Sequence, residues 1–461
     1  MSHQGYRVLV FGGAKGMGLW IADFLARSGH EITIADIDKE TPKIAVTRNF
    51  KGVVLTKGDR YLTPVLTNDG YCDCDVAVIA VTINVTPDVI RQVGPRLRAG
   101  SLLMDVTSVK NPAMQAMDEA ASPGVGVLGT HPMFGPDALS FFGQTCIIVP
   151  SQIHPPERWL EWWTHLLKQE GALYTTSTAE KHDQMMLVVQ VLLHYVLICF
   201  GMALPMVGVN LNQADSFKSP MYEITMGLVS RIFSQPPDTY YWIQKHPDGE
   251  TVRNLFIQCS NKICDTFKKS TLPQYNKLRL DIREAIGETN VAAYSSIAAA
   301  IIRERANQRK TLLKAEGKTT CIENVESKKI HYGIVREVSP NAVTIETLIK
   351  NRETVQISLK KARLLSPEET NKWKLQCLPL KRMTLSFLAP QEANPQVITS
   401  LASNRFGVEK VAVVDIYSSP KIMTGKKKIT LAITVTTDQE GEAAYSEIRK
   451  LLEGIGCVMI L

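Results

Sequence analysis

The chain has 461 residues, 45% of them hydrophobic and 21% charged, which is the composition of a soluble globular protein of roughly two to four domains. Its nine cysteines show no disulfide framework, so a disulfide-stabilised secreted protein is not favoured, and its net charge of +7 is modest for this length. The first residues, MSHQGYRVLVFGG, enter a strand and a glycine turn without the segments of a secretory signal, and we expect a cytoplasmic protein.

Residues 1–175 alternate short β-rich runs with helical patterns. Seven runs are predicted to be strands, and most of them lack polar alternation: YRVLVFG, HEITIAD, GVVLT, DVAVIAVT, SLLMDVT, VGVLGTH and TCIIVP. Such continuous apolar runs fit a parallel sheet that is buried on both faces. We therefore predict a doubly wound α/β domain for this segment.

Residues 176–316 change to long helical patterns and predict an all-helical domain, with a homodimer interface on its apolar faces. The longest apolar stretch, MMLVVQVLLHYVLICFGMALPMVGV, contains Gln190 and His194. These polar residues favour a buried helix over a membrane span.

Two smaller modules are predicted after a linker at EGKTTC. Residues 317–378 contain HYGIVREVSPNAVTIETL and ETVQISLKKARLLS, which are typical of hairpins in a small, barrel-like antiparallel module. Residues 379–461 give strand, helix, strand, strand, helix and strand in turn, the βαββαβ order of a ferredoxin-like domain. The basic run Lys426 to Lys428 within it is expected to be a solvated turn.

A glycine-rich turn in VLVFGGAKGMGLWIADFLARSG joins the first predicted strand to the first helix, as in Rossmann-type domains. Backbone amides of such a turn and the helix N-terminus receive a pyrophosphate, which makes these the candidate cofactor residues: Gly12, Gly13, Gly16, Met17 and Gly18. The glycine spacing is G-x-x-x-G-x-G, as in short-chain dehydrogenases, and not G-x-G-x-x-G. A tight turn without a ligand is the alternative.

Asp36 ends the second predicted strand and is the candidate residue for the adenosine ribose. A carboxylate there accepts hydrogen bonds from the ribose hydroxyls and repels a 2′-phosphate, which favours NAD over NADP. Asp38 is an alternative ribose partner. Lys15 or Arg48 can receive a phosphate, so NADP stays open as the cofactor. No metal is expected, because the close pair Cys72 and Cys74 lacks further ligands.

Six blocks carry a resemblance to a known family: GGAKGMG, VAVIAVTINVTPDVI, LLMDVTSVKNPAMQAM, VLGTHPMFGPD, EKHDQMMLVVQVLLHYVLICFG and SPMYEITMGLVSRIFSQPP. In this order they resemble the prephenate dehydrogenases of tyrosine biosynthesis, over about residues 6–300. The SVKN and HPMFGPD blocks are the most diagnostic. The resemblance implies oxidative decarboxylation of prephenate to 4-hydroxyphenylpyruvate, with hydride passed to a nicotinamide.

The resemblance implies catalytic roles for His131 and Ser108. As hydride leaves the ring carbon, its hydroxyl must lose a proton, and a neutral imidazole suits this near pH 7. His131 is predicted at the carboxyl end of a strand, where such folds bind ligands. Ser108 is given a supporting hydrogen bond near the same hydroxyl. The alternatives are a core-packed His131, and capping of the next helix by Thr107 and Ser108.

Substrate binding is implied for Arg231 and His194. Prephenate carries two carboxylates, and the guanidinium of Arg231 matches the family's arginine for the ring carboxylate. An ordinary surface ion pair is the alternative for Arg231. His194 matches a substrate-side histidine, with a satisfied core histidine as the alternative.

The tail, through VEKVAVVDIYSSPKIMTGKKKITLAITV, resembles the anticodon-binding domain of phenylalanyl-tRNA synthetases. A regulatory amino-acid-binding module has the same βαββαβ order, but the loop APQEANP lacks the glycine turn that such modules use. A passive stabilising or oligomerising module is a further alternative for this segment.

The alternative functions are arogenate dehydrogenase, another NAD(P)-dependent reductase, and a nucleic-acid-binding regulator. The reductase alternative rests on the glycine spacing and on the Y-x-x-x-K pattern of Tyr241 and Lys245. We treat that pattern as chance, because it lies too far along the chain from the glycine turn. Nucleic acid is an unfavoured partner, because the tail has few aromatic side chains to stack on bases.

Overall fold

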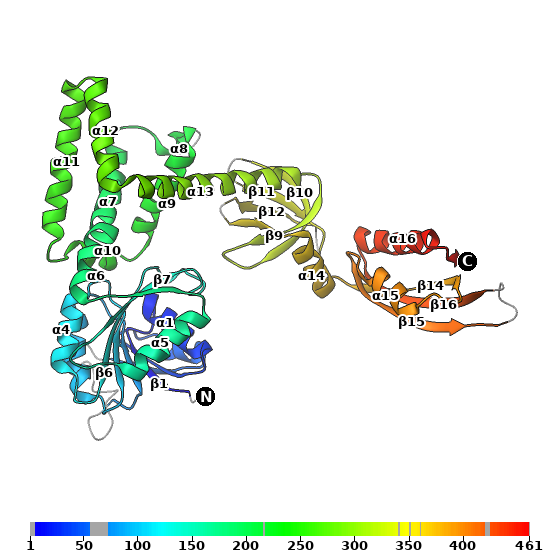
Figure 1. The fold of residues 1–461 in the computed structure, drawn as a ribbon, viewed down its shortest axis with the longest axis horizontal. Helices are drawn as coiled ribbons and strands as arrows, with labels where there is room; N and C mark the ends of the chain where they lie inside the picture. The colour runs from blue at the N-terminus through cyan, green and yellow to red at the C-terminus, as the bar shows by residue number, and fades with distance from the viewer. Residues whose placement is uncertain are drawn as a thin grey trace. The chain divides into compact units, whose positions relative to one another are not determined.

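The structure of the protein, a computed structural model, describes residues 5–55, 72–214, 217–339, 342–349, 352–359, 361–419 and 425–460. The chain, whose elements are labelled in Figure 1, divides into two compact units, Met1–Ile282 and Arg283–Leu461.

An eight-stranded sheet organises the first unit, in the order β3-β2-β1-β4-β5-β6-β7-β8. Its strands are β1 (Arg7–Phe11), β2 (Glu31–Asp36), β3 (Lys51–Val54), β4 (Val76–Ile79), β5 (Leu102–Asp105), β6 (Gly126–Pro132), β7 (Thr145–Pro150) and β8 (Leu173–Thr176). The doubly wound α/β fold is thus confirmed. The sheet is not wholly parallel, because β7 runs antiparallel to β6 after a connection without a crossover helix.

Helices cover both faces of this sheet. Trp20 and Phe24 of α1 (Gly16–Arg27) and Trp163 of α5 (Glu157–Gln169) pack on one face, together with α2 (Thr41–Arg48). Ile90 of α3 (Thr86–Val93) and Met114 of α4 (Asn111–Ala120) pack on the other. Because both faces are covered, the strands carry continuous apolar sequence.

A continuous helix follows the sheet, built from α6 (Ala179–Met186), the π-helical turn η3 (Leu187–Leu192) and α7 (Leu193–Met206). It starts where the Thr178 side chain accepts a hydrogen bond from the Lys181 backbone. The rest of the helical segment consists of α8 (Leu211–Ala214), α9 (Pro220–Ser234), α10 (Pro237–Gln244), α11 (Gly249–Lys269) and α12 (Leu272–Ile286).

The expectation that this long apolar helix is buried is wrong for the single chain. Only 11% of its most apolar window is buried, although Leu197 packs on Val229 and Ile232 of α9. Among the described residues it is the one helix long and apolar enough to cross a membrane, by length and composition alone. The pair α12 and α13 (Glu288–Lys314) meets that test only when counted as one span.

In the second unit, α13 leads into a five-stranded antiparallel sheet of order β12-β11-β10-β9-β13. Its strands are β9 (Thr319–Asn324), β10 (Ile330–Val338), β11 (Ala342–Thr347), β12 (Thr354–Ser358) and β13 (Ala362–Leu364). Leu312 and Ala315, at the end of the α13 segment, share a core with Val335 and Ile345. The last turn of this helix therefore belongs to the β-rich module.

The tail has the predicted βαββαβ order. After α14 (Pro367–Cys377), a four-stranded sheet of order β15-β16-β14-β17 packs on two helices: β14 (Leu380–Pro390), α15 (Pro395–Ser403), β15 (Val408–Tyr417), β16 (Lys426–Thr436), α16 (Gln439–Gly454) and β17 (Val458–Met459). Phe387, Leu431 and Ile448 are in its core. Lys426 to Lys428 do not form a solvated turn as expected, because they begin β16 and pair with β14.

Candidate active site

The glycine turn after β1 leaves no room for side chains on its inner side. A Cβ on Gly12, whose φ is 75°, would lie 2.5 Å from the carbonyl oxygen of Ala80, and one on Gly18 would lie 2.1 Å from that of Gly12. On the outer side, Gly16 has a φ of 59° and a Cβ there would meet nothing within 4 Å. The turn therefore packs tightly against β4 and presents open backbone outward, which fits a pyrophosphate at the start of α1.

Asp36 is buried at the end of β2, beside this turn. Its Oδ2 accepts a hydrogen bond from the Ala14 amide at 3.0 Å, and its Oδ1 accepts one from the Asp38 amide at 3.1 Å. Each carboxylate oxygen has a second acceptor site, so Asp36 can hold the turn and still receive ribose hydroxyls. Nearby, Lys15 Nζ lies 3.8 Å from Asp38 Oδ2 at a more exposed position. The turn and Asp36 together fit a dinucleotide.

His131 lies in β6 and is 3% exposed, at the centre of a chain of hydrogen bonds. Its Nδ1 is 2.9 Å from His182 Nε2, and His182 Nδ1 is 2.8 Å from Asp183 Oδ1. On the other side of the ring, Gln190 Nε2 is 3.3 Å from His131 Nε2. Gln190 is carried by the π-helical turn η3, a local geometry that often occurs at functional sites.

One assignment of protons satisfies all these contacts. His182 donates its Nδ1 proton to the Asp183 carboxylate, which leaves Nε2 of His182 as an acceptor. His131 then donates its Nδ1 proton to His182, and its own Nε2 carries the lone pair. The Gln190 amide donates to that lone pair. Asp183 thus fixes the tautomer of both rings and leaves the Nε2 of His131 as the basic atom.

Asp183 is itself held by the start of α4. The backbone amides of Lys110 and Asn111 donate to its two oxygens at 2.7 and 2.8 Å. Burial alone would raise the pKa of Asp183, but hydrogen bonds from His182 and these two amides hold it below its ordinary value. The carboxylate is therefore ionised at neutral pH, and it ties α6 to the sheet domain.

Burial also sets the protonation of the two histidines. Desolvation, helped by the neighbouring His182 and Lys110, lowers the pKa of His131 well below 6.5. Desolvation also lowers the pKa of His182, although Asp183 opposes this. Both rings are consequently neutral near pH 7, and His131 is ready to accept a proton.

A buried ion pair lies beneath this chain. Lys110 and Asp105 have fully buried side chains, with Nζ 2.5 Å from Oδ2, and the Thr107 amide donates to the same oxygen at 2.9 Å. Burial raises the pKa of Asp105 and lowers that of Lys110, while their mutual attraction opposes both shifts. Asp105 Oδ1 has no hydrogen-bond partner among the described residues.

Thr107 and Ser108 do not cap the following helix, so this structural alternative to a catalytic role for Ser108 is wrong. The residue before α4 is Lys110, without a side-chain cap, and the first free amides of α4 bond to Asp183 instead. Ser108 is half-buried and lies three residues after β5, the strand that pairs with β6. Its hydroxyl is thus left for another role.

Arg231 and His194 belong to a second cluster beside the loop that follows His131. A Cβ on Gly135 of this loop would lie 2.7 Å from Arg231 Nη2, so the missing side chain makes room for the guanidinium. Arg231 Nη1 is 3.3 Å from Asp137 Oδ2, which is the surface ion pair considered as its alternative. The His194 ring packs edge-on against Tyr240 at 5.0 Å, and burial lowers its pKa to about 4.

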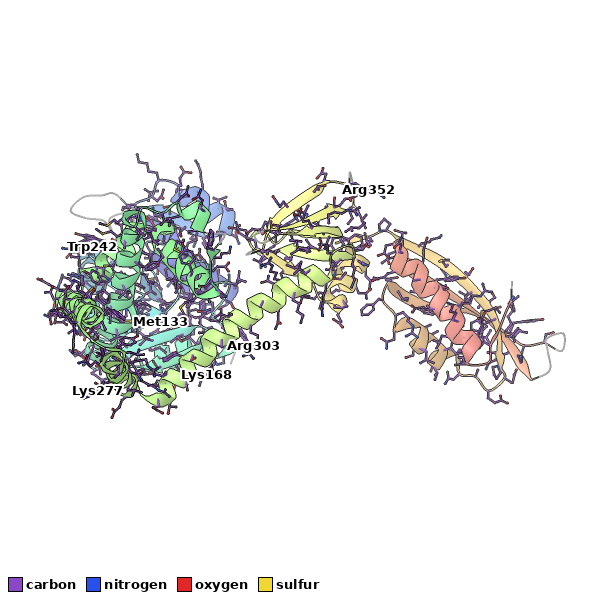
Figure 2. The ribbon with its side chains drawn as sticks, turned by 90° about the horizontal axis from the view of Figure 1, so that it is seen from above. Met133, Lys168, Trp242, Lys277, Arg303 and Arg352 are labelled. Atoms are coloured by element: carbon purple, nitrogen blue, oxygen red, sulfur yellow. The ribbon has the colours of Figure 1, made fainter. Side chains whose placement is uncertain are left out.

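The same loop is fixed to the helix of the glycine turn. Trp20 of α1 donates its indole proton to the Ala138 carbonyl at 2.6 Å and packs edge-on against Phe134 at 4.9 Å. Met133, labelled in Figure 2, lies two residues after His131 in this loop. His131, Arg231 and the glycine turn are thus brought to one edge of the sheet, where ligands bind in such folds.

Sequence reasoning missed His182, Asp183 and Lys110, although the quoted blocks contain all three. The signal was the adjacent pair His182 and Asp183 at the start of a helix, and a lysine between strand and helix in SVKN.

This fold, with an open glycine turn beside a buried neutral histidine, defines a nicotinamide-dependent dehydrogenase. Residues 21–176 match the family model for the prephenate dehydrogenase nucleotide-binding domain, and residues 178–277 match the model for the prephenate dehydrogenase dimerization domain. The two matches cover more than half of the chain. The chain belongs to the prephenate/arogenate dehydrogenase family of NAD-dependent oxidoreductases.

Three relatives illustrate the similarity. A probable arogenate/prephenate dehydrogenase of Methanocaldococcus jannaschii is 29% identical over 458 residues, which is 99% of both chains. The T-protein of Enterobacter agglomerans is 32% identical over 50% of this chain and 54% of its own. A 4-amino-4-deoxyprephenate dehydrogenase of Streptomyces pristinaespiralis is 25% identical over 61% of this chain and 92% of its own.

Proposed function

We propose that the protein oxidises and decarboxylates prephenate to 4-hydroxyphenylpyruvate with NAD. The observation that carries the proposal is the chain Asp183, His182 and His131, which fixes a neutral, basic Nε2 at the carboxyl edge of the sheet. Arogenate is the second candidate substrate, because the relative from M. jannaschii is named for both activities. Initial-rate assays with each substrate, and with NAD and NADP in turn, test the choice. Activity with neither substrate would overturn the proposal.

In the proposed mechanism one proton moves from the substrate hydroxyl to His131 and returns to the product. The glycine turn and Asp36 would hold NAD, which would supply the acceptor for the hydride that leaves the ring carbon bearing the hydroxyl. Once the substrate hydroxyl replaces the Gln190 amide at its lone pair, His131 Nε2 takes the hydroxyl proton as that carbon becomes a carbonyl, and Ser108 contributes a hydrogen bond near the same oxygen. Loss of CO2 then sends its bonding electrons into the ring and makes it aromatic. The resulting phenolate can recover the proton from His131, so no second strong base is required.

In this proposal His182 and Asp183 are positioning residues, because they act on the substrate only through their hydrogen bonds to His131. When His131 becomes protonated, its Nδ1 proton still points to His182, and the ionised Asp183 stabilises the positive charge on the pair. Because the rings are buried, this electrostatic help is little screened by solvent.

Arg231→Ala is expected mainly to raise the Michaelis constant for the substrate. A carboxylate clamp binds ground and transition states alike, so its loss weakens binding more than turnover. Arg231→Lys should recover part of the affinity, because it keeps the charge and loses the planar fork. Initial-rate kinetics test this. A change in thermal stability alone would leave Arg231 as the partner of Asp137 only.

Asp36→Ala is expected to relax discrimination against NADP, because the carboxylate that repels a 2′-phosphate is removed. Affinity for NAD should fall as well, because Asp36 also holds the amides of Ala14 and Asp38. The ratio of kcat/KM for the two cofactors measures the effect, with Asp38→Ala as the matched control. An unchanged ratio for Asp36→Ala and a changed one for Asp38→Ala would assign the role to Asp38.

The homodimer proposed for the helical domain accounts for its exposed apolar side chains. Large ones on α7, α9 and α11 are exposed in the single chain, namely Phe200, Met202, Met206, Leu228, Phe233 and Leu255. The matched family model is described as a dimerization domain. Gln190 and Asp183 tie the first half of the long helix to the sheet domain, which favours a partner subunit over a membrane as its cover. Sedimentation equilibrium tests this, and a monomer would contradict it.

We propose a cytoplasmic location and no role in binding nucleic acid. The likeness of the tail to an anticodon-binding domain stays a proposal about its fold. Salt-dependent RNA binding that is lost on removal of residues 380–461 would favour the nucleic-acid alternative.

A further inference from the structure

The proton-accepting atom of His131 is covered by another side chain. His131 is 3% exposed, and its basic Nε2 lies 3.3 Å from the amide nitrogen of Gln190. The Gln190 side chain therefore occupies the lone pair that must receive the substrate proton. A substrate hydroxyl can bond to this nitrogen only after the Gln190 amide has moved. Gln190 thus controls access to the base.

Gln190 lies in the π-helical turn η3, whose backbone is held from outside the helix. Such a turn departs from the hydrogen-bond register of an α-helix, so its backbone groups need partners beyond those of the regular helix. The carbonyl of the neighbouring Val191, which is 1% exposed, accepts a hydrogen bond from Gln244 Nε2 at 2.8 Å. The Gln244 side chain therefore fixes the turn directly beside Gln190.

Gln244, the last residue of α10, is itself anchored to the start of α11. Its backbone carbonyl accepts a hydrogen bond from Arg253 Nη1 at 2.5 Å. A Cβ on Gly249 would lie 2.9 Å from that carbonyl oxygen and 2.9 Å from Arg253 Nη1, so the glycine leaves the space that this contact needs. An anchored backbone and one side-chain donor thus hold the carbonyl of Val191 in place.

We propose that Gln190 is a further catalytic residue, which covers His131 Nε2 until substrate binds and then donates its amide proton in a hydrogen bond to the substrate oxygen, and that Gln244 positions it. Since this inference rests on the proposed function, the oxygen concerned is that of the hydroxyl on the oxidised ring carbon. That oxygen must lie within hydrogen-bond distance of His131 Nε2, where the Gln190 amide now lies, so the displaced amide stays next to it.

The proposed hydrogen bond helps most in the transition state. Deprotonation of the hydroxyl places electron density on its oxygen while hydride leaves the carbon, and a donor already in place stabilises that density. The Gln190 amide keeps its protons, so the proton still moves from the hydroxyl to His131. Loss of this donor should therefore lower kcat more than it changes the Michaelis constant.

Chemical modification of the full-length protein tests the cover. Diethyl pyrocarbonate acylates accessible neutral imidazole nitrogens, and mass mapping of peptides reports each histidine separately. In the wild-type protein His131 should react at least about tenfold more slowly than the exposed His165. Gln190→Ala should accelerate the reaction of His131 by about tenfold and leave His165 unchanged. Equal rates at His131 in the wild-type protein and in Gln190→Ala would overturn the cover.

Steady-state kinetics test the donor. Gln190→Met keeps the length of the side chain but cannot donate, and it should lower kcat by about tenfold to a hundredfold with little change in the Michaelis constant. A normal kcat in Gln190→Met would overturn the catalytic role. Wild-type protein that oxidises neither prephenate nor arogenate would overturn the proposed function instead, and the protection of His131, which needs no turnover, would still decide the cover.

A double-mutant cycle tests the positioning role of Gln244. Gln244→Leu should lower kcat by about threefold to tenfold, because it removes one hydrogen bond to the turn. If Gln244 acts through Gln190, its replacement should cause no further loss in the Gln190→Met background. Additive losses would overturn the positioning role and leave Gln244 a structural residue.

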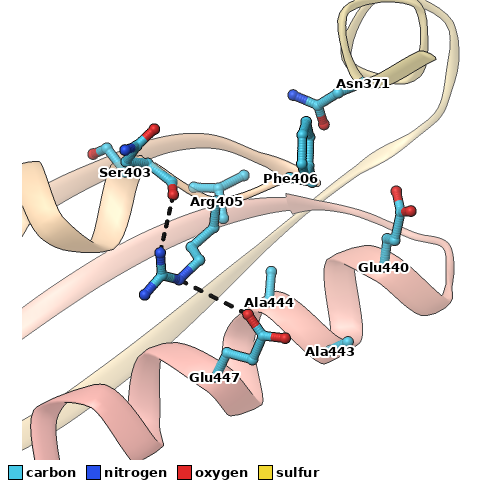
Figure 3. Close-up of a pocket in the computed structure, with 10 residues that line it drawn as sticks. Asn371, Ser403, Arg405, Phe406, Glu440, Ala443, Ala444 and Glu447 are labelled. Carbon is cyan, nitrogen blue, oxygen red and sulfur yellow. Dashed lines mark hydrogen bonds and ion pairs between the residues drawn. The ribbon is translucent and has the colours of Figure 1, made fainter. Parts of the chain in front are cut away.

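Two control variants should leave kcat unchanged. Gln115→Leu makes the same chemical change on the exposed face of α4, where Gln115 contacts Glu119. Glu447→Gln removes the ion pair with Arg405 in the cavity of the second unit, drawn as a dashed line in Figure 3, and so tests for the loss of a polar contact in the other unit.

Discussion

His131→Asn is expected to lower turnover by about two to four orders of magnitude, the usual contribution of a positioned general base. Asparagine keeps a polar group in β6 but cannot accept and return a proton at Nε2. Cofactor affinity should stay nearly intact, because the glycine turn that we propose as the pyrophosphate site packs on β1 and the end of β4, away from the side chain of His131. Steady-state kinetics and cofactor titration measure the two effects.

The pH dependence gives this prediction a second readout. Burial lowers the pKa of His131 well below 6.5, and only the neutral ring can accept the proton. Activity should therefore persist as the pH falls below 6.5 and decline only as it passes through the lowered pKa. His131→Asn should remove that acid limb from the profile of kcat/KM. The exposed His165 of α5 is the matched control, and His165→Asn should change neither the rate nor the profile.

A near-normal rate in His131→Asn would remove the residue from the mechanism and leave the core-packed alternative. A pH profile whose acid limb lies above pH 6.5 would contradict the lowered pKa of His131 and the neutral state of its ring near pH 7. In that case His131 would be at least partly protonated at neutral pH, and its Nε2 would not be free to take the hydroxyl proton.

The sequence predicted the glycine turn and the position of His131 because both depend on local pattern. The buried strands have continuous apolar runs, and the prolines and the glycine that follow His131 mark the edge of the sheet. The partners of His131 could not be predicted in this way. His182 is 51 residues away, and its contact arises from the docking of α6 on the start of α4. Local patterns do not specify such docking.

Burial was predicted less well than secondary structure, for a physical reason. The high hydropathy of the helix Ala179–Met206 indicates that its surface must be shielded from water. It does not indicate whether its own chain or another molecule does so. Lys110 shows the opposite case, because lysine side chains are seldom fully buried. Its side chain is fully buried, and only the three-dimensional contact with Asp105 explains this.

Lys110→Met is expected to lower the free energy of unfolding by about 3–5 kcal/mol, because it leaves Asp105 buried without its counter-charge. Chemical denaturation measures this loss. The backbone amide of residue 110 remains in the variant, so Asp183 keeps that hydrogen bond. Lys43→Met, which removes one member of the exposed pair with Glu40, is the matched control and should change stability little.

The double variant Lys110→Met with Asp105→Asn should recover much of the loss, because it removes the unpaired charge and keeps an acceptor for the Thr107 amide. The pH dependence of the single variant has a definite sign. Without Lys110, burial raises the pKa of Asp105 in the folded state further above that of the unfolded chain, so the folded state binds more protons. Its stability must then fall as the pH rises through this interval, and the deficit should be smallest in acid. An equal loss in single and double variants, independent of pH, would show that Lys110 acts through packing and not through its charge.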